Sequence, residues 1–135
     1  MGENKKMVNE NSCSCSSDEC LILACSGASN VGQLTNEVAK RLSMEGLGKF
    51  FCIVGVGAHI SGMVESVRGT KKILVLDGCP AQCAKKCLDH EGFSIYSHLV
   101  ITDYNIKKNH DFFLNEEDIN NIRTICKQKL FTDRA

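Results

Sequence analysis

The sequence has no excess charge of either sign and no long hydrophobic run. Lys and Arg number 16, as do Asp and Glu, so the net charge gives no attraction to nucleic acid or to an anionic membrane. No apolar stretch approaches the roughly 18 residues that a membrane-spanning helix needs. Residues 1–6 are polar and lack the apolar segment of a secretory signal. We therefore expect a cytoplasmic protein that binds neither nucleic acid nor a membrane.

Two familiar motifs are also missing. The chain has no Cys-x-x-Cys pair, so it does not encode a thioredoxin-type redox pair. Gly55 and Gly57 begin like a dinucleotide-binding loop, but Ile60 stands where the third glycine of that motif belongs. Neither a thioredoxin-like enzyme nor a nucleotide-dependent dehydrogenase is therefore indicated.

Cysteine, in contrast, is abundant, with nine residues in a chain of 135. Cytosolic thiols stay reduced, and an odd number excludes complete pairing into disulfides. Metal binding or thiol chemistry is the better explanation for several of them. Cys126 is an exception, because it falls in an amphipathic pattern with Ile122 and Leu130 and is expected to be a small buried hydrophobe.

Apolar runs alternate with helical patterns along most of the chain. Strands are expected at residues 21–25, 50–56, 73–76 and 98–102, and helices at about 30–45, 61–67, 79–90 and from 115 onward. This alternation predicts a single three-layer α/β domain with a mainly parallel sheet of about four strands. A flavodoxin-like strand order would make the first and third strands neighbours, so that Cys25 and Cys79 would face one crevice.

The two ends of the chain differ from this central region. Residues 1–20 are polar, carry Cys13, Cys15 and Cys20, and are expected to form a flexible tail. Residues 111–135 are expected to supply a C-terminal helix that packs on the domain.

Three cysteines recur every four residues directly after the third apolar run. Pro80 suits a first helical turn, which would place Cys79 at a helix N-terminus, where backbone N–H groups favour a thiolate. Cys79, Cys83 and Cys87 would then share one helical face. Asp77 is expected to cap this helix.

An ordered set of short motifs resembles the DGC domain family, proteins described as zinc-binding and named for an Asp-Gly-Cys motif. The set spans residues 21–108 and comprises Ala24-Cys25-Ser26-Gly27, Asn30-Val31-Gly32-Gln33, Cys52 with Gly55 and Gly57, Asp77-Gly78-Cys79-Pro80 with Cys83, Thr102-Asp103 and Lys108. The resemblance implies a DGC-like α/β domain over residues 21–110. It also implies a Zn²⁺ site formed by Cys25, Cys52, Cys79 and Cys83.

The expected strand at 50–56 conflicts with a ligand role for Cys52. Cys52 would lie near the start of that strand, roughly 13 Å from its carboxyl end. It could bind the metal only if the strand ended early, and otherwise Cys87 or His59 would replace it. Cys87, however, would lie roughly 12 Å from Cys79 along a helix that included both.

Three functions fit these thiols. The first is zinc binding at the carboxyl end of the sheet. The second is a thiol-dependent redox or sulfur- or phosphoryl-carrier enzyme, with Cys79 or Cys25 as the nucleophile. The third is a metal-trafficking or sensing module that captures metal with its tail thiols. The sequence identifies no protein partner, and His90, His98 and His110 are expected to be surface or strand residues.

Overall fold

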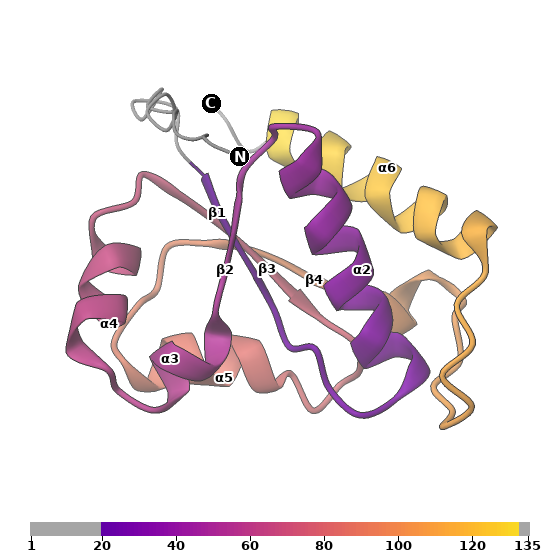
Figure 1. The fold of residues 1–135 in the computed structure, drawn as a ribbon, viewed down its shortest axis with the longest axis horizontal. Helices are drawn as coiled ribbons and strands as arrows, with labels where there is room; N and C mark the ends of the chain where they lie inside the picture. Colours follow the sequence, from indigo (N-terminus) through magenta and orange to yellow (C-terminus); the bar gives the residue numbers. More distant parts are fainter. Residues whose placement is uncertain (1–19, 133–135) are drawn as a thin grey trace, which may run out of the picture.

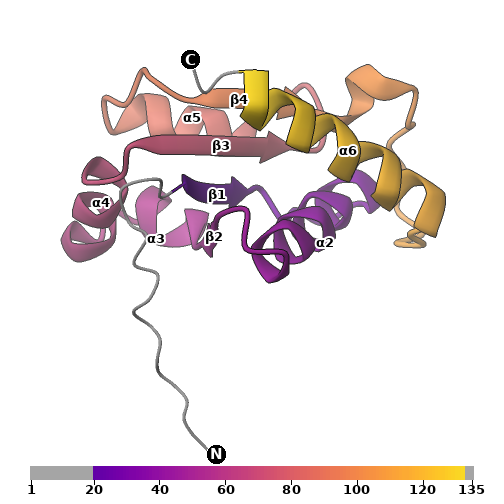
Figure 2. The ribbon, with the colours of Figure 1, turned by 90° about the horizontal axis from the view of Figure 1, so that it is seen from above.

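The computed structural model describes residues 20–132. Its four strands form one parallel sheet in the order β2-β1-β3-β4, and Figure 2 shows them side by side in this order. The strands are β1 (Cys20–Ala24), β2 (Lys49–Phe51), β3 (Lys72–Asp77) and β4 (Ser97–Val100). The α/β fold with a parallel sheet of four strands is thus confirmed, and β1 and β3 are neighbours. A flavodoxin-like sheet has a fifth strand beside the fourth, so that finer assignment stays a prediction.

Helices cover both faces of the sheet. They are α2 (Asn30–Met44), α3 (Ile53–Gly57), α4 (Ser61–Arg68), α5 (Cys83–His90), the 3-10 helix η3 (Ile101–Tyr104) and α6 (Glu116–Thr132). In Figure 1, α2 and α6 lie on one side of the strands and α3, α4 and α5 on the other. This arrangement gives three layers. No helix in residues 20–132 is long and apolar enough to cross a membrane.

The central strands β1 and β3 are buried on both sides, which explains their continuous apolar sequences. Ile22 and Ala24 of β1 pack into a core cluster with α2 and α6, which we call the α2/α6 core. Leu21 and Leu23 pack into a second cluster with α3, α4 and α5, which we call the α3/α5 core. Successive strand residues point to opposite faces, so Cys25, the residue after β1, packs against the α3/α5 core.

The second strand is shorter than the sequence predicts. β2 ends at Phe51, and residues 53–57 form α3 instead of continuing the strand. Ile53 and Val56 are buried whereas Val54 is 71% exposed, which is the spacing of a helix. A short apolar run does not distinguish a strand from a buried helical turn. The expected strand at 50–56 was therefore wrong after residue 51, and Cys52 lies at the carboxyl end of β2.

Other cysteine predictions concern Cys13, Cys15, Cys20 and Cys126. Cys20, expected in the tail, is instead the first residue of β1 and is buried, and burial raises its pKa to about 11. Cys126 is buried in α6 as expected, and burial raises its pKa to about 12. Cys13 and Cys15 lie outside the described residues.

Candidate functional site

Three neighbouring strands lead directly into cysteine-bearing segments at one edge of the sheet. Cys25 follows β1, Cys52 follows β2, and Cys79 follows β3 by two residues. The Cys25 backbone N–H donates to the Leu76 carbonyl over 2.9 Å, so it continues the ladder between β1 and β3. The parallel order therefore brings three of the predicted ligands to the carboxyl edge, where sites of such sheets lie.

A buried threonine holds the turn that carries Cys25. Thr35 of α2 is fully buried, and its hydroxyl lies 3.7 Å from the Cys25 sulfur. The same hydroxyl accepts a hydrogen bond from the Ser26 backbone N–H and donates one to the Gly32 carbonyl. Ser26 has a φ of 51°, a strained value for a residue with a side chain. Thr35 therefore stabilises an unusual turn beside the thiol.

Two glycines, Gly32 and Gly78, let the loops at this edge approach α2 closely. A Cβ atom at Gly32 would lie 2.5 Å from the Gly27 carbonyl oxygen, and one at Gly78 would lie 2.8 Å from the Gly32 nitrogen. These distances are well inside van der Waals contact. The glycine of the Asp-Gly-Cys motif is thus required because the loop after β3 packs on the first turn of α2.

Asp77 caps α5, as the sequence predicts. Its carboxylate accepts hydrogen bonds from the backbone N–H groups of Ala84 (2.8 Å) and Lys85 (3.0 Å). The Asp77 side chain is 1% exposed and also lies 2.9 Å from the His98 Nε2 atom. His98 does lie in a strand, but no sequence pattern indicated this contact. The Asp77 carboxylate therefore ties β4 to the start of α5.

The helix that carries the cysteines begins later than predicted. Gln82 adopts a left-handed conformation, with a φ of 54°, and α5 starts at Cys83. Cys79 and Pro80 lie in the preceding turn, where the Gln82 N–H donates to the Cys79 carbonyl. The prediction that Cys79 occupies a helix N-terminus was therefore wrong. Cys83 is the thiol at that position.

Cys79 instead contacts a lysine from a distant loop. The Lys108 ammonium lies 3.6 Å from the Cys79 sulfur. Asn30, which is buried at the start of α2, holds the loop by donating from its side-chain amide to the Lys107 carbonyl (2.8 Å) and accepting from the Asn109 N–H (2.6 Å). Ser29 caps α2 by accepting a hydrogen bond from the Gly32 backbone N–H. Sequence reasoning found Lys108 only as part of a motif and missed its contact.

Cys83 and Cys87 lie one turn apart on α5. Cys83 is exposed, whereas Cys87 is half-buried against the α3/α5 core. Burial raises the pKa of Cys87, and the neighbouring charges of Cys83 and Asp77 raise it further. A Cβ atom at Gly57 would lie only 3.2 Å from the Cys87 sulfur, so this glycine leaves room for the thiol.

The four predicted ligands are not gathered into one cluster. Over residues 20–132, no group of three or more His, Cys, Asp or Glu side chains is arranged to hold a metal ion. Cys25 packs against the α3/α5 core, whereas Cys79 packs against the α2/α6 core. His59, the predicted substitute ligand, contacts Glu91 and the ring of His90. The donor atoms suit Zn²⁺, which thiolates bind readily, but the side chains would have to turn to surround it.

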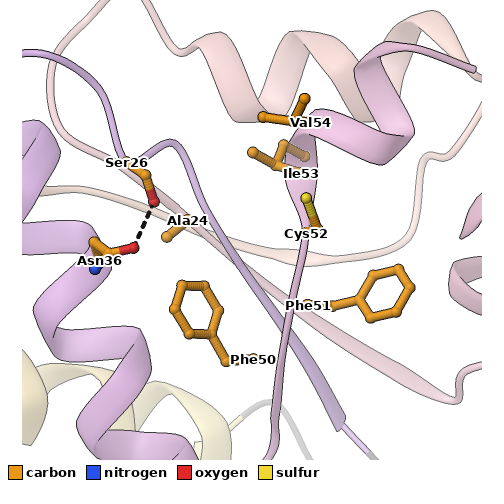
Figure 3. Close-up of a pocket in the computed structure, with 8 residues that line it drawn as sticks. All are labelled: Ala24, Ser26, Asn36, Phe50, Phe51, Cys52, Ile53 and Val54. Atoms are coloured by element: carbon orange, nitrogen blue, oxygen red, sulfur yellow. Dashed lines mark hydrogen bonds between the residues drawn. The ribbon is translucent and has the colours of Figure 1, made fainter.

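Cys52 also borders an open pocket of about 310 Å³ (Figure 3). The Ser26 hydroxyl donates to the Asn36 side-chain carbonyl over 2.9 Å beside it. Phe50 and Phe51 point to opposite sides of β2 in Figure 3. The pocket is lined by Ala24, Ser26, Asn36, Phe50, Phe51, Cys52, Ile53 and Val54. The Cys52 thiol is therefore accessible from solvent.

Comparison with known proteins supports the motif-based assignment. The family model of the DGC domain matches residues 21–126, from the second residue of β1 into α6. The chain belongs to the DGC domain family. It is also 42% identical over 88 residues to the "anaerobic and virulence modulator AnvM" of Pseudomonas aeruginosa, a match that covers 65% of this chain and 67% of AnvM. No solved structure matches the chain.

Proposed function

We propose that this DGC-domain protein binds Zn²⁺ through cysteine thiolates at the carboxyl edge of its sheet. The ligands expected from the family motifs are Cys25, Cys52, Cys79 and Cys83. The observation that carries the proposal is the convergence of three strand ends and the start of α5, each with a cysteine, on this one edge. A set of four cysteine sulfur ligands is typical of structural zinc sites.

The charge and exposure of these thiols are compatible with metal binding. Cys52 and Cys83 are exposed, and Cys25 and Cys79 are half-buried, so none is locked in a core. Four thiolates around Zn²⁺ carry a formal charge of −2, which the nearby Lys108 ammonium would partly balance. Bound zinc would hold the loops after β1, β2 and β3 together.

The zinc content of protein purified under reducing conditions without chelator tests this proposal. We expect about one zinc per chain, removal of the zinc by Cys83→Ser, and retention in the control Cys126→Ala, whose thiol is buried in α6. Zinc-free protein that takes up no added zinc would contradict the proposal.

A second candidate function is supported by the contact between Lys108 and Cys79. The Lys108 ammonium lies 3.6 Å from the Cys79 sulfur, where it could stabilise the charge of a substrate or intermediate bound to this thiol. We therefore propose Cys79 as the nucleophile of a thiol-dependent reaction. In metal-free protein Cys79 should be alkylated faster than Cys126, and Lys108→Met should slow this labelling. Equal alkylation rates at Cys79 and Cys126 would exclude Cys79 as the nucleophile.

The sensing alternative rests on similarity. AnvM is named an anaerobic and virulence modulator, and a metal-trafficking or sensing role for this chain is a third proposal. Truncation of residues 1–19 tests the part played by the tail thiols. A metal content above one per chain that falls to one on truncation would support capture by Cys13 and Cys15, whereas unchanged content would exclude it.

A further inference from the structure

The loop that brings Lys108 to Cys79 is fixed to the start of α2. Asn30 donates from its side-chain amide to the Lys107 carbonyl over 2.8 Å and accepts from the Asn109 N–H over 2.6 Å. Its own backbone N–H also donates to the Asn109 carbonyl over 3.0 Å. Asn30 is 7% exposed, so these hydrogen bonds are shielded from water. The backbone on either side of Lys108 is therefore held at three points by one buried residue.

A second anchor joins this segment to the loop after β3. The Thr102 backbone N–H donates to the Gly78 carbonyl over 3.2 Å, and Gly78 itself packs on the first turn of α2. Ile106 and Cys79 both pack against the α2/α6 core. The 3.6 Å between the Lys108 ammonium and the Cys79 sulfur is thus set by backbone segments that are tied to each other and to α2.

The segments that meet around Cys79 carry positive charge only. They are residues 25–33, 78–82 and 104–110. Their only Asp, Glu, Lys or Arg side chains are Lys107 and Lys108, although the whole chain has equal numbers of acids and bases. The N-terminus of the 15-residue helix α2, which has no acid in its first turn, adds to this positive potential.

The acids that border these segments do not cancel this charge at the sulfur. The Asp77 carboxylate is buried and bonded to the N–H groups at the start of α5. Asp103 and Asp111, on either side of the last segment, are exposed to water, which screens them. Lys108 is the charged side chain that contacts the Cys79 sulfur, so an anion that approaches this thiol meets a cation.

We propose that the Cys79–Lys108 pair reacts with electrophiles that carry an anionic group next to the reacting atom, and that Asn30 is the positioning residue for Lys108. The Cys79 proton goes to solvent, the sulfur bonds to the electrophilic atom, and the leaving group departs with the electron pair of the broken bond. No oxidant or reductant is needed. The ammonium pairs with the anionic group. This inference rests on the proposed role of Cys79 as a nucleophile and names its substrate class.

Two alkylating reagents that differ by one charge test the substrate class. Iodoacetate and iodoacetamide both alkylate sulfur and release iodide, but only iodoacetate is an anion. The ratio of their rates at Cys79, iodoacetate over iodoacetamide, is measured in the metal-free full-length protein by peptide mass spectrometry. We expect Lys108→Met to lower this ratio about fivefold, the effect of one unit charge about 4 Å away in water, and Lys108→Arg to retain it. High salt should lower the ratio in the unmodified protein but not in Lys108→Met.

Asn30→Ala tests the positioning role, with Asn36→Ala as the matched control. Asn36 lies on the same helix but accepts a hydrogen bond from Ser26, far from the loop around Lys108. Asn30→Ala should lower the rate ratio nearly as far as Lys108→Met and should have no further effect when the two are combined. Asn36→Ala should leave the ratio unchanged. Urea unfolding checks that each variant folds, and Asn30→Ser, which keeps a polar group at this buried position, replaces an Asn30→Ala that does not.

The outcomes separate this inference from the nucleophile on which it rests. Rapid labelling of Cys79 by both reagents, at a ratio that does not depend on Lys108, would overturn the substrate class and leave the nucleophile intact. A ratio that falls in Lys108→Met but not in the Asn30 variant would overturn the positioning role. Labelling of Cys79 no faster than that of Cys126 with either reagent would refute the nucleophile itself.

Discussion

Replacing Gly78 with alanine should destabilise the protein, because this glycine packs directly on the backbone of α2. A Cβ atom at position 78 would lie 2.8 Å from the Gly32 nitrogen, 2.8 Å from the Val31 carbonyl carbon and 2.9 Å from the Val31 oxygen. These atoms belong to the first turn of a helix and cannot rotate away as a side chain could. Either α2 or the loop after β3 must shift.

The expected change in the free energy of unfolding has two opposing contributions. Overpacking a well-packed region typically costs about 1–3 kcal/mol. Alanine also restricts the unfolded chain, which returns about 0.4–1 kcal/mol. We therefore expect Gly78→Ala to lower the free energy of unfolding by about 1–2 kcal/mol. The shift would also move the adjacent Cys79 and weaken its contact with Lys108.

Urea unfolding of the zinc-free protein measures this effect without a contribution from the metal. Gly62→Ala is a matched control, because Gly62 lies in α4 and a Cβ atom added there would have nothing within 4 Å. That variant should gain about 0.5–1 kcal/mol from the higher helix propensity of alanine. If Gly78→Ala proves as stable as the unmodified protein, the close packing of this loop on α2 is not present in solution.

Two further predictions concern buried titratable groups. Asp77→Ala should lower the free energy of unfolding by about 3 kcal/mol, since two backbone N–H groups and His98 lose a buried acceptor. The exposed control Asp89→Ala should cost less than about 1 kcal/mol, and equal losses in the two variants would refute the capping role. Burial raises the pKa of Cys126 from 9.0 to about 12, so the neutral thiol is favoured in the folded state. Its contribution to stability is complete below pH 9 and is lost as the pH rises toward 12. Stability should therefore fall less steeply above pH 9 in Cys126→Ala than in the unmodified protein, and parallel pH profiles would contradict this.

The sequence predicts the parts of the fold that depend on local pattern. Buried runs such as residues 73–76 and the helical stripe of Leu34, Val38 and Leu42 correspond to β3 and α2. The residues after Phe51 were assigned wrongly because a five-residue helix and a buried strand can have the same apolar composition. Because β2 ends at Phe51, Cys52 lies at the carboxyl edge of the sheet and not inside a strand.

The details of the site depend on contacts that no local pattern contains. The start of α5 is set by the left-handed Gln82, an uncommon conformation for a residue with a side chain. The contact of Lys108 with Cys79 depends on hydrogen bonds between Asn30 and a loop nearly eighty positions later in the chain. Spacing along the sequence therefore indicated which residues carry the chemistry, but not which thiols face the same core.

X-ray absorption spectroscopy at the zinc edge tests most directly whether thiolates at this sheet edge bind the metal. Protein loaded with one equivalent of Zn²⁺ should show a shell of four sulfur atoms at about 2.3 Å. Cys83→Ser should lose one sulfur from this shell or fail to retain zinc. A shell composed of nitrogen and oxygen at about 2.0–2.2 Å would contradict a thiolate site.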